Sequence, residues 1–192
     1  MRGQAYTLEA VIASTLLISS LVFALQVTAV TPLSASTSNQ HIENQQRASA
    51  SGVLTAAQEA DALEPAVLFW NDNEAEFHDT GGRNFYTNDY PPNEFGDILN
   101  RSFSGRGLAV NVFVHHGNGT DRMLYNGEPS DNAVAADRMV TLYDDDWLRD
   151  STNSRYKQLS DANDDDLYLE SDNQPNNGVY DVVRVEVVVW RM

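Results

Sequence analysis

The hydrophobic residues of this chain follow two different patterns. Residues 10–30 form an apolar run without a charged residue, which only a glutamine and small hydroxyl side chains interrupt. At about 1.5 Å per residue this run would rise roughly 32 Å as a helix, which matches the ~30 Å hydrocarbon core of a bilayer. We therefore predict an N-terminal helix that is long enough to span a membrane.

A second helical stretch is predicted from about residue 40, where apolar residues recur at spacings that place them on one helical face. These residues are Ile42, Ala50, Val53, Leu54, Ala57 and Leu63. The helix should end near Glu64 and Pro65. Between the two stretches, Thr31 and Pro32 would break or kink the helix, because proline lacks a backbone donor and restricts the residue before it. The Ser/Thr-rich residues that follow are either a short extended linker or a kinked continuation.

After residue 65 the pattern changes to short apolar runs between clusters of Gly, Asn, Asp and Pro, which is typical of strands and turns. The clearest strands are residues 108–115, 138–143 and 179–190. In the last of these, alternate positions share one face and carry Val183, Val185, Val187 and Val189. We expect this strand to complete a sheet.

These patterns predict an α+β fold, in which a long N-terminal helix with a transmembrane half and an amphipathic half precedes a mostly antiparallel β head domain. The expected organisation is residues 1–31 as the transmembrane helix, residues 32–64 as linker and amphipathic helix, and residues 65–192 as the β-rich head.

The charges around the apolar run predict its orientation. Arg2 precedes it, and the next charged residues after it are Glu43 and Arg47. By the positive-inside rule the N-terminus lies in the cytoplasm and the head outside the cell. A cleaved secretory signal and a plain signal anchor are two interpretations of this segment. Small residues at positions 34–36 suit cleavage, although secretory signals have apolar regions of only about 7 to 15 residues.

The composition excludes one class of partner and suggests an environment. A formal charge of -16, from 12 basic and 28 acidic residues, argues against nucleic acid as a partner, since phosphates require a basic face. The acidic residues are mostly aspartates, and Lys157 is the only lysine. This resembles the proteins of extreme halophiles, while an ordinary acidic secreted domain is the alternative. The chain has no cysteine, so disulfides and thiolate metal sites are excluded.

The residues before the apolar run carry a resemblance to a known family. Arg2-Gly3-Gln4, followed by Thr7-Leu8-Glu9 and the apolar run, resembles the class III signal segment of archaeal type IV pilins and archaellins. The run LVFALQVTAVTPLSASTSNQHIENQQRA is similar to a haloarchaeal family of pilin-like secreted proteins.

The resemblance implies that a prepilin-type peptidase cuts after Gly3, that Gln4 begins the mature chain, and that Glu9 pairs with an amine of a neighbouring pilin-like subunit. Glu9 is the sixth residue counted from Gln4, whereas the pilin glutamate is usually the fifth. The alternative for Glu9 is a headgroup-level position near the helix N-terminus, where the macrodipole favours a carboxylate by about 0.3 to 1 kcal/mol. Membrane lipid is the other partner expected for the apolar run.

Motifs of catalysis are missing from the sequence. It contains no G-x-S-x-G, no phosphate-binding loop and no H-E-x-x-H, so we expect neither an enzyme nor a cofactor. His115 and His116 are neighbours on a predicted strand, so their side chains should point to opposite faces and not share a metal. His41 and His78 stand alone in polar surroundings and should be solvated.

An acidic stretch and two sequons remain as candidate sites. Asp161, Asn163, Asp165 and Asp172 occupy positions 1, 3, 5 and 12 of a calcium loop, but Asp166 stands where its sharp turn requires glycine. This makes calcium a weak candidate beside a solvated acidic surface. Asn118 and Asn100 begin N-x-S/T sequons and are candidate glycan acceptors in exposed loops, with an unmodified turn asparagine as the alternative.

These observations favour a non-enzymatic, pilin-like surface protein of the cell membrane or of an extracellular filament. The alternative is a signal-anchored extracellular domain that binds a ligand or cation. A cell-surface hydrolase is a remoter alternative, because no nucleophile and base can be named.

Overall fold

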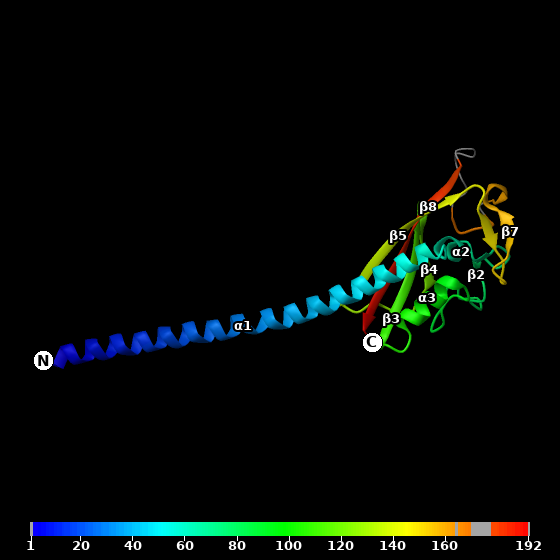
Figure 1. The fold of residues 1–192 in the computed structure, drawn as a ribbon. Helices are drawn as coiled ribbons and strands as arrows, with labels where there is room; N and C mark the ends of the chain where they lie inside the picture. Colours follow the sequence, from blue (N-terminus) through cyan, green and yellow to red (C-terminus); the bar gives the residue numbers. More distant parts are fainter. Residues whose placement is uncertain (1, 164, 170–177, 192) are drawn as a thin grey trace. The chain divides into compact units, whose positions relative to one another are not determined.

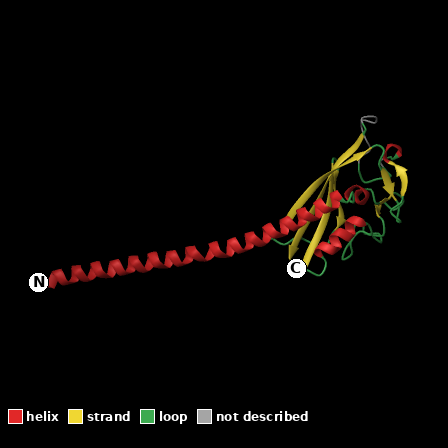
Figure 2. Cartoon of the chain, viewed as in Figure 1, coloured by secondary structure: helices red, strands yellow, loops and turns green. Residues whose placement is uncertain are grey.

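The computed structural model describes residues 2–163, 165–169 and 178–191, with the backbone alone for residues 2–5 and 25–39. The fold is α+β, as predicted: one long N-terminal helix precedes mostly antiparallel sheets (Figures 1 and 2). The chain divides into two compact units, Met1–Ile42 and Glu43–Met192.

The first unit consists of the N-terminal part of helix α1, which spans Arg2–Glu59. Pro32 lies inside this helix and does not end it. The prediction of an extended linker after Pro32 is therefore wrong. The alternative, a helical continuation, is confirmed. A proline removes one hydrogen bond from the ladder, and the bonds of the neighbouring turns keep the following residues helical.

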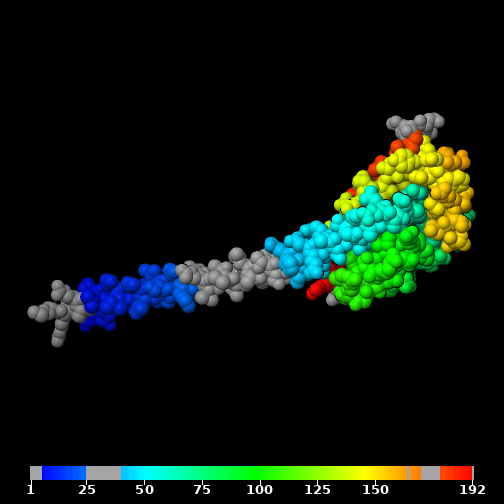
Figure 3. Space-filling model, viewed as in Figure 1, coloured from blue at the N-terminus to red at the C-terminus, as the bar shows by residue number. Residues whose placement is uncertain are grey.

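The C-terminal part of α1 belongs to the second unit and is amphipathic, as predicted. Its buried side chains recur at helical spacing and are those of Gln46, Ala50, Val53, Leu54 and Ala57. Figure 3 shows this part of α1, in cyan, between green and yellow segments of the same unit. The last turns of α1 are thus a core helix of the second unit.

The end of this helix differs from the prediction. α1 ends at Glu59, Asp61 adopts a left-handed φ of 51°, and a short helix α2 follows over Leu63–Val67. Glu64 and Pro65, expected to terminate a helix, lie in the first turn of α2. Proline is tolerated there because the first N–H groups of a helix have no intrahelical acceptor.

The main sheet has four antiparallel strands in the order β4-β3-β8-β5. Their bounds are Gly119–Leu124 for β4, Leu108–His116 for β3, Val179–Arg191 for β8 and Val134–Tyr143 for β5. The three predicted strands are confirmed, and β8 does complete the sheet, between β3 and β5. β5 begins four positions earlier than predicted, because pairing with β8 extends it over Val134–Asp137, where alanines give little β signal.

One face of this sheet forms the core. The alternating valines of β8 share one face, as predicted, and this face is buried together with Val110, Val112 and Val114 of β3. They join one hydrophobic cluster with α1, α2 and helix α3, Glu94–Phe103. Gly96 of α3 is required by packing, since a Cβ there would lie 1.8 Å from the carbonyl oxygen of Pro91.

Two small hairpins complete the second unit. β1, Trp70–Asn71, pairs with β2, Glu76–Phe77, and β6, Trp147–Arg149, pairs with β7, Arg155–Gln158, which a 3-10 turn over Leu159–Asp161 follows. Tyr168 packs against Trp70 and Phe77, with ring centroids 4.8 and 5.4 Å away. This aromatic cluster joins the β1-β2 hairpin to the rest of the core.

Candidate functional site

The apolar part of α1 is the clearest functional feature of the first unit. Residues Tyr6–Ala24 have a mean hydropathy of 1.9, are long and apolar enough to cross a membrane, and expose all their side chains. The hydroxyls of Ser14 and Thr15 both donate to the carbonyl of Val11, and Ser20 donates to Leu17. Since these polar groups are satisfied within the helix, the segment fits a membrane anchor or a signal sequence.

Glu9 lies on this segment and is exposed. Among the side chains that the structure describes, none forms an ion pair with it. Gly3 and Gln4 belong to α1 by their backbone, and their side chains lie outside the described residues. The processing and assembly roles of these three residues remain predictions.

The two neighbouring histidines point to opposite faces, as predicted. His115 lies 2.8 Å from Thr120 Oγ1 through Nδ1 and 2.8 Å from Glu186 Oε2 through Nε2. The His116 ring is buried against Tyr168 and lies 2.9 Å from Asp121 Oδ2. Each ring has its own carboxylate partner on a different face of the sheet.

His78 is not solvated, contrary to the prediction. Its Nε2 lies 2.9 Å from the carbonyl oxygen of Arg149, and its ring packs edge-on against Phe69. The surrounding sequence is polar, but the β1-β2 hairpin folds back on β6 and leaves the ring half-buried. His41 is exposed, as predicted.

The proposed calcium loop is occupied by internal contacts. Asp166 accepts hydrogen bonds from Lys157 Nζ and from the backbone N–H of Asn163. Asp161 and Asp165 are exposed, and Asp172 lies outside the described residues. Within residues 2–163, 165–169 and 178–191, no group of three or more acidic or histidine side chains converges to hold a metal.

The two sequons have different surroundings. Asn118 is exposed in the turn between β3 and β4, as predicted. Asn100 is exposed on α3 and not in a loop, which corrects the prediction. The helix forms there because Asn93 caps it, accepting the Gly96 N–H at 3.0 Å, and because Phe95, Leu99 and Phe103 bury one face.

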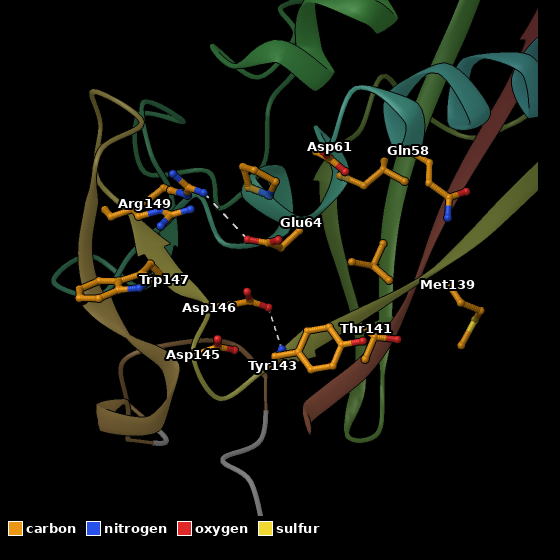
Figure 4. A pocket seen from close by; sticks show the side chains of 14 residues that line it. Gln58, Asp61, Glu64, Met139, Thr141, Tyr143, Asp145, Asp146, Trp147 and Arg149 are labelled. Atoms are coloured by element: carbon orange, nitrogen blue, oxygen red, sulfur yellow. Dashed lines mark hydrogen bonds and ion pairs between the residues drawn. The ribbon is translucent and has the colours of Figure 1, made fainter. Parts of the chain in front are cut away.

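A groove in the second unit was not predicted. We call it the β5 groove; its volume is about 590 Å³, and it lies between the end of α1, α2, the edge of β5 and β6 (Figure 4). Four of its lining residues come from β5, namely Met139, Val140, Thr141 and Tyr143. Acidic side chains from two directions line it as well: Asp61, Glu64, Asp145 and Asp146. Arg149 and Arg155 are its cationic residues.

The electrostatics of the β5 groove leave two carboxylates short of compensation. Burial raises the pKa of Glu64, and the nearby charge of Asp146 raises it further against the effect of Arg149. Burial also raises the pKa of Asp146, although its Oδ2 accepts the Tyr143 N–H at 2.7 Å. Arg149 Nη2 is 3.9 Å from Glu64 Oε1, too far for a hydrogen bond. With four acidic and two basic side chains in its lining, the groove is net acidic.

Backbone contacts hold the wall of this groove in place. The Arg149 N–H donates to the carbonyl of Leu68 at 2.9 Å, which joins β6 to the end of α2. The Asp144–Asp146 run was the only sign of the groove in the sequence, and an acidic run alone is typical of a solvated surface. Its partner Glu64 is distant in the sequence and was expected at the end of a helix.

Comparisons with known proteins give one match. The sequence model of a family described as "Family of unknown function (DUF7288)" matches residues 2–189. No curated protein and no solved structure matches the chain.

Proposed function

The chain belongs to the DUF7288 family, whose description assigns no function, and we propose from its residues that it is a membrane-anchored, pilin-like surface protein. It would serve as a subunit of a type IV pilus-like filament or of its assembly machinery. The observation that carries the proposal is the exposed apolar surface of Tyr6–Ala24 with a single carboxylate, Glu9, near its start.

An apolar surface of this extent requires cover. Lipid covers it in a membrane, and the helices of other subunits cover it in a filament. A carboxylate within an apolar helix costs about 2.5 to 3.5 kcal/mol at the bilayer centre and less near the interface. A cation of a neighbouring subunit would remove that cost on assembly. The amphipathic part of the same helix supports the proposal, because Val53 and Leu54 fix it in the core of the head domain.

The proposal includes processing and location. A prepilin-type peptidase cuts after Gly3, Gln4 begins the mature protein, and the head lies outside the cell. In this location Asn118 in its turn and Asn100 on α3 are accessible glycan acceptors. The acidic surface suits a halophile, because screening at molar salt, where the Debye length is roughly 3 Å, weakens the repulsion between carboxylates.

The deciding experiment is mass spectrometry of the mature N-terminus in the native host. We expect the protein to begin at Gln4 and to retain the apolar helix. A mature protein that begins near residue 37 would have discarded this helix as a secretory signal and would overturn the proposal.

A matched pair of variants tests the role of Glu9. Glu9→Gln should leave membrane insertion intact and reduce cross-linking to partner pilin subunits. Glu59→Gln, at an exposed position of the same helix in the second unit, should change neither. Equal cross-linking in both variants would leave Glu9 as an interfacial carboxylate without a role in assembly.

The β5 groove favours a second candidate function, a signal-anchored extracellular binding domain. In this case Glu9→Gln has no effect on association, and the ligand binds to the head. Calorimetry of residues 38–192 with calcium in high salt tests the cation-binding form of this candidate, and the absence of heat would contradict it.

A further inference from the structure

We propose that the β5 groove captures an extended segment of a partner polypeptide, which pairs with the open edge of β5 and places a lysine or arginine side chain beside Glu64 and Asp146. The inference goes beyond the proposed function, because it concerns the head domain and holds for an anchored binding domain as well as for a filament subunit.

β5 has an open edge. This strand lies at one end of the four-stranded sheet and pairs with β8 alone. Among the described residues, no backbone hydrogen bond joins Val134–Leu142 to any element other than β8. An edge strand presents a row of free N–H and C=O groups, to which an extended peptide can add as a new strand.

Only part of the β5 edge is accessible. The carbonyl of Asp137 accepts a hydrogen bond from the Arg138 guanidinium, whose Nη2 also donates to Thr55 Oγ1 of α1 at 2.8 Å. This side chain therefore covers the edge at Asp137. Because backbone groups alternate along a strand, those of Met139 and Thr141 point to the same side as that carbonyl. Both residues line the β5 groove, so the free edge and the groove coincide.

The lining of the β5 groove is net acidic. In Figure 4, Asp145 and Asp146 lie beside Tyr143 and the Glu64 carboxylate points toward Arg149, all on the side of the groove away from Met139. The pKa of Glu64 and that of Asp146 are both raised, with burial as the largest cause, although Arg149 and Arg155 are close. A cationic side chain between these carboxylates would form charge-assisted hydrogen bonds and relieve their repulsion.

The size and shape of the β5 groove suit an extended peptide better than a single ion. A space of about 590 Å³ is far larger than a single metal ion needs and accommodates a short extended segment with one long side chain. Met139 and Tyr143 are exposed, with 54% and 48% of their surfaces accessible, and offer apolar and aromatic cover for the stem of that side chain.

The charge of the chain favours a different polypeptide over a second copy as the occupant. A second copy would bring 28 acidic and only 12 basic residues to the acidic groove, whereas a basic segment of another polypeptide complements the groove by direct contact. A second copy could offer the groove only an arginine, because its single lysine, Lys157, is already bound by two carboxylates.

The test uses the full chain in detergent micelles and a set of fluorescent probes of the form acetyl-Thr-Val-Arg-Val-Thr-amide, with varied residues flanking the arginine. One control peptide carries citrulline, which keeps the shape of arginine without its charge. A second carries N-methylated backbone amides, which cannot donate to an edge strand. Anisotropy should show binding about tenfold weaker for the citrulline peptide, and no binding for the N-methylated one.

Variants locate the binding. Glu64→Gln should weaken binding of the arginine peptide about tenfold. Glu59→Gln, at an exposed position of α1 outside the groove, should leave this binding unchanged. Hydrogen exchange should slow at the amides of Met139 and Thr141 on binding. Unfolding curves of both variants show whether the head remains folded.

Three results would overturn the proposal. The first is equal binding of the arginine and citrulline peptides, or no binding of any probe up to about 1 mM. The second is protection from exchange elsewhere on the head and not on β5. The third is self-association of the head that a Thr141→Pro variant abolishes, since it would make a second copy the occupant of the edge. None of these outcomes affects the position of the mature N-terminus, so the pilin-like function is tested separately.

Discussion

The Nζ atom of Lys157 lies 2.7 Å from Oδ1 of Asp166, and both side chains are partly buried, with 29% and 17% of their surfaces accessible. The same Nζ lies 3.3 Å from Asp72 Oδ2. The single lysine of the chain thus joins β7 to the turn after β1 and to the stretch considered above for calcium. The hydrogen bond with Lys157 is the main cause that lowers the pKa of Asp166, and Asp166 is in turn the main cause that raises the pKa of Lys157.

Replacing this lysine should destabilise the head in a defined pH range. Lys157→Gln should lower the free energy of unfolding by about 1 kcal/mol at neutral pH, the upper range for a partly exposed ion pair. The contribution of Asp166 is present above its ordinary pKa of 3.8 and is lost as the pH falls through its lowered value. That of Lys157 is present below 10.5 and is lost as the pH rises through its raised value.

Urea unfolding of the wild type and of Lys157→Gln across this pH range checks the prediction. Lys157→Arg serves as the control, because it retains the charge. A difference between wild type and Lys157→Gln that stays constant below the lowered pKa of Asp166 would argue against the ion pair as its source.

The contribution of Glu64 to stability should change with pH in the direction opposite to that of Asp166. In the folded state its pKa is raised above the ordinary value of 4.5, which holds for the unfolded state. Between the unfolded and the folded pKa, the folded state therefore binds more protons than the unfolded state. The free energy of unfolding therefore falls as the pH rises through this window. Glu64→Gln should remove this slope and stabilise the head at neutral pH by about 0.5 kcal/mol, a small value because the side chain is 37% exposed.

Denaturant titrations of Glu64→Gln between pH 4 and pH 8 measure this effect, with Glu59→Gln as the exposed control on α1. A loss of stability in Glu64→Gln at neutral pH would mean that the long contact with Arg149 outweighs the burial of the carboxylate.

Local patterns in the sequence predicted the parts of the fold that depend on neighbouring residues. The alternation of Val183 to Val189 identified β8 and the face that its valines share, and the spacing of Val53, Leu54 and Ala57 identified the apolar face of α1. Pro65 misled the prediction, because a proline marks either the end of a helix or the first turn of another one.

The β5 groove could not be predicted, because its chemistry depends on tertiary structure. Glu64 follows α1, Asp146 precedes β6, and the sheet brings β5 beside both. Each of these residues by itself is typical of a solvated surface. Burial distinguishes them, and burial depends on the complete fold. The apolar surroundings of Glu9, in contrast, could be predicted, because its neighbours in the sequence supply them.

Gly96 should tolerate no side chain. Its position faces the backbone of Pro91, and a Cβ would lie 1.8 Å from the carbonyl oxygen and 2.8 Å from the carbonyl carbon. Gly96→Ala must therefore shift either the start of α3 or the loop before it. We expect a loss of about 3 kcal/mol in the free energy of unfolding, measured by chemical denaturation.

Gly52→Ala is the matched control for this substitution. Gly52 lies within α1 and is exposed, and a Cβ at this position would meet no other atom within 4 Å. Alanine is favoured over glycine in a helix by about 1 kcal/mol, so this variant should be as stable as the wild type or more stable. Equal losses in the two variants would refute the steric argument.

The second unit should fold without the apolar helix. A chain that begins at residue 40 retains every buried residue of the α1 core face, from Gln46 to Ala57. We expect it to unfold cooperatively, with a melting temperature close to that of the full chain in detergent. A chain that begins at residue 60 exposes the apolar residues that α1 covers and should be unfolded or aggregated, as judged by circular dichroism and calorimetry.

The place of β8 in the sheet has a consequence for biogenesis. β3 and β5 pair with β8 and not with each other, so the sheet lacks its centre until residues 179–191 have left the ribosome. Pairing between segments so distant in sequence is also slow. Before β8 joins the sheet the head cannot form its core, and an unfolded head is the state in which a polypeptide can be threaded through a membrane. If the head is translocated as we propose, folding follows that step, and an acidic chain without cysteine needs no oxidant to complete it.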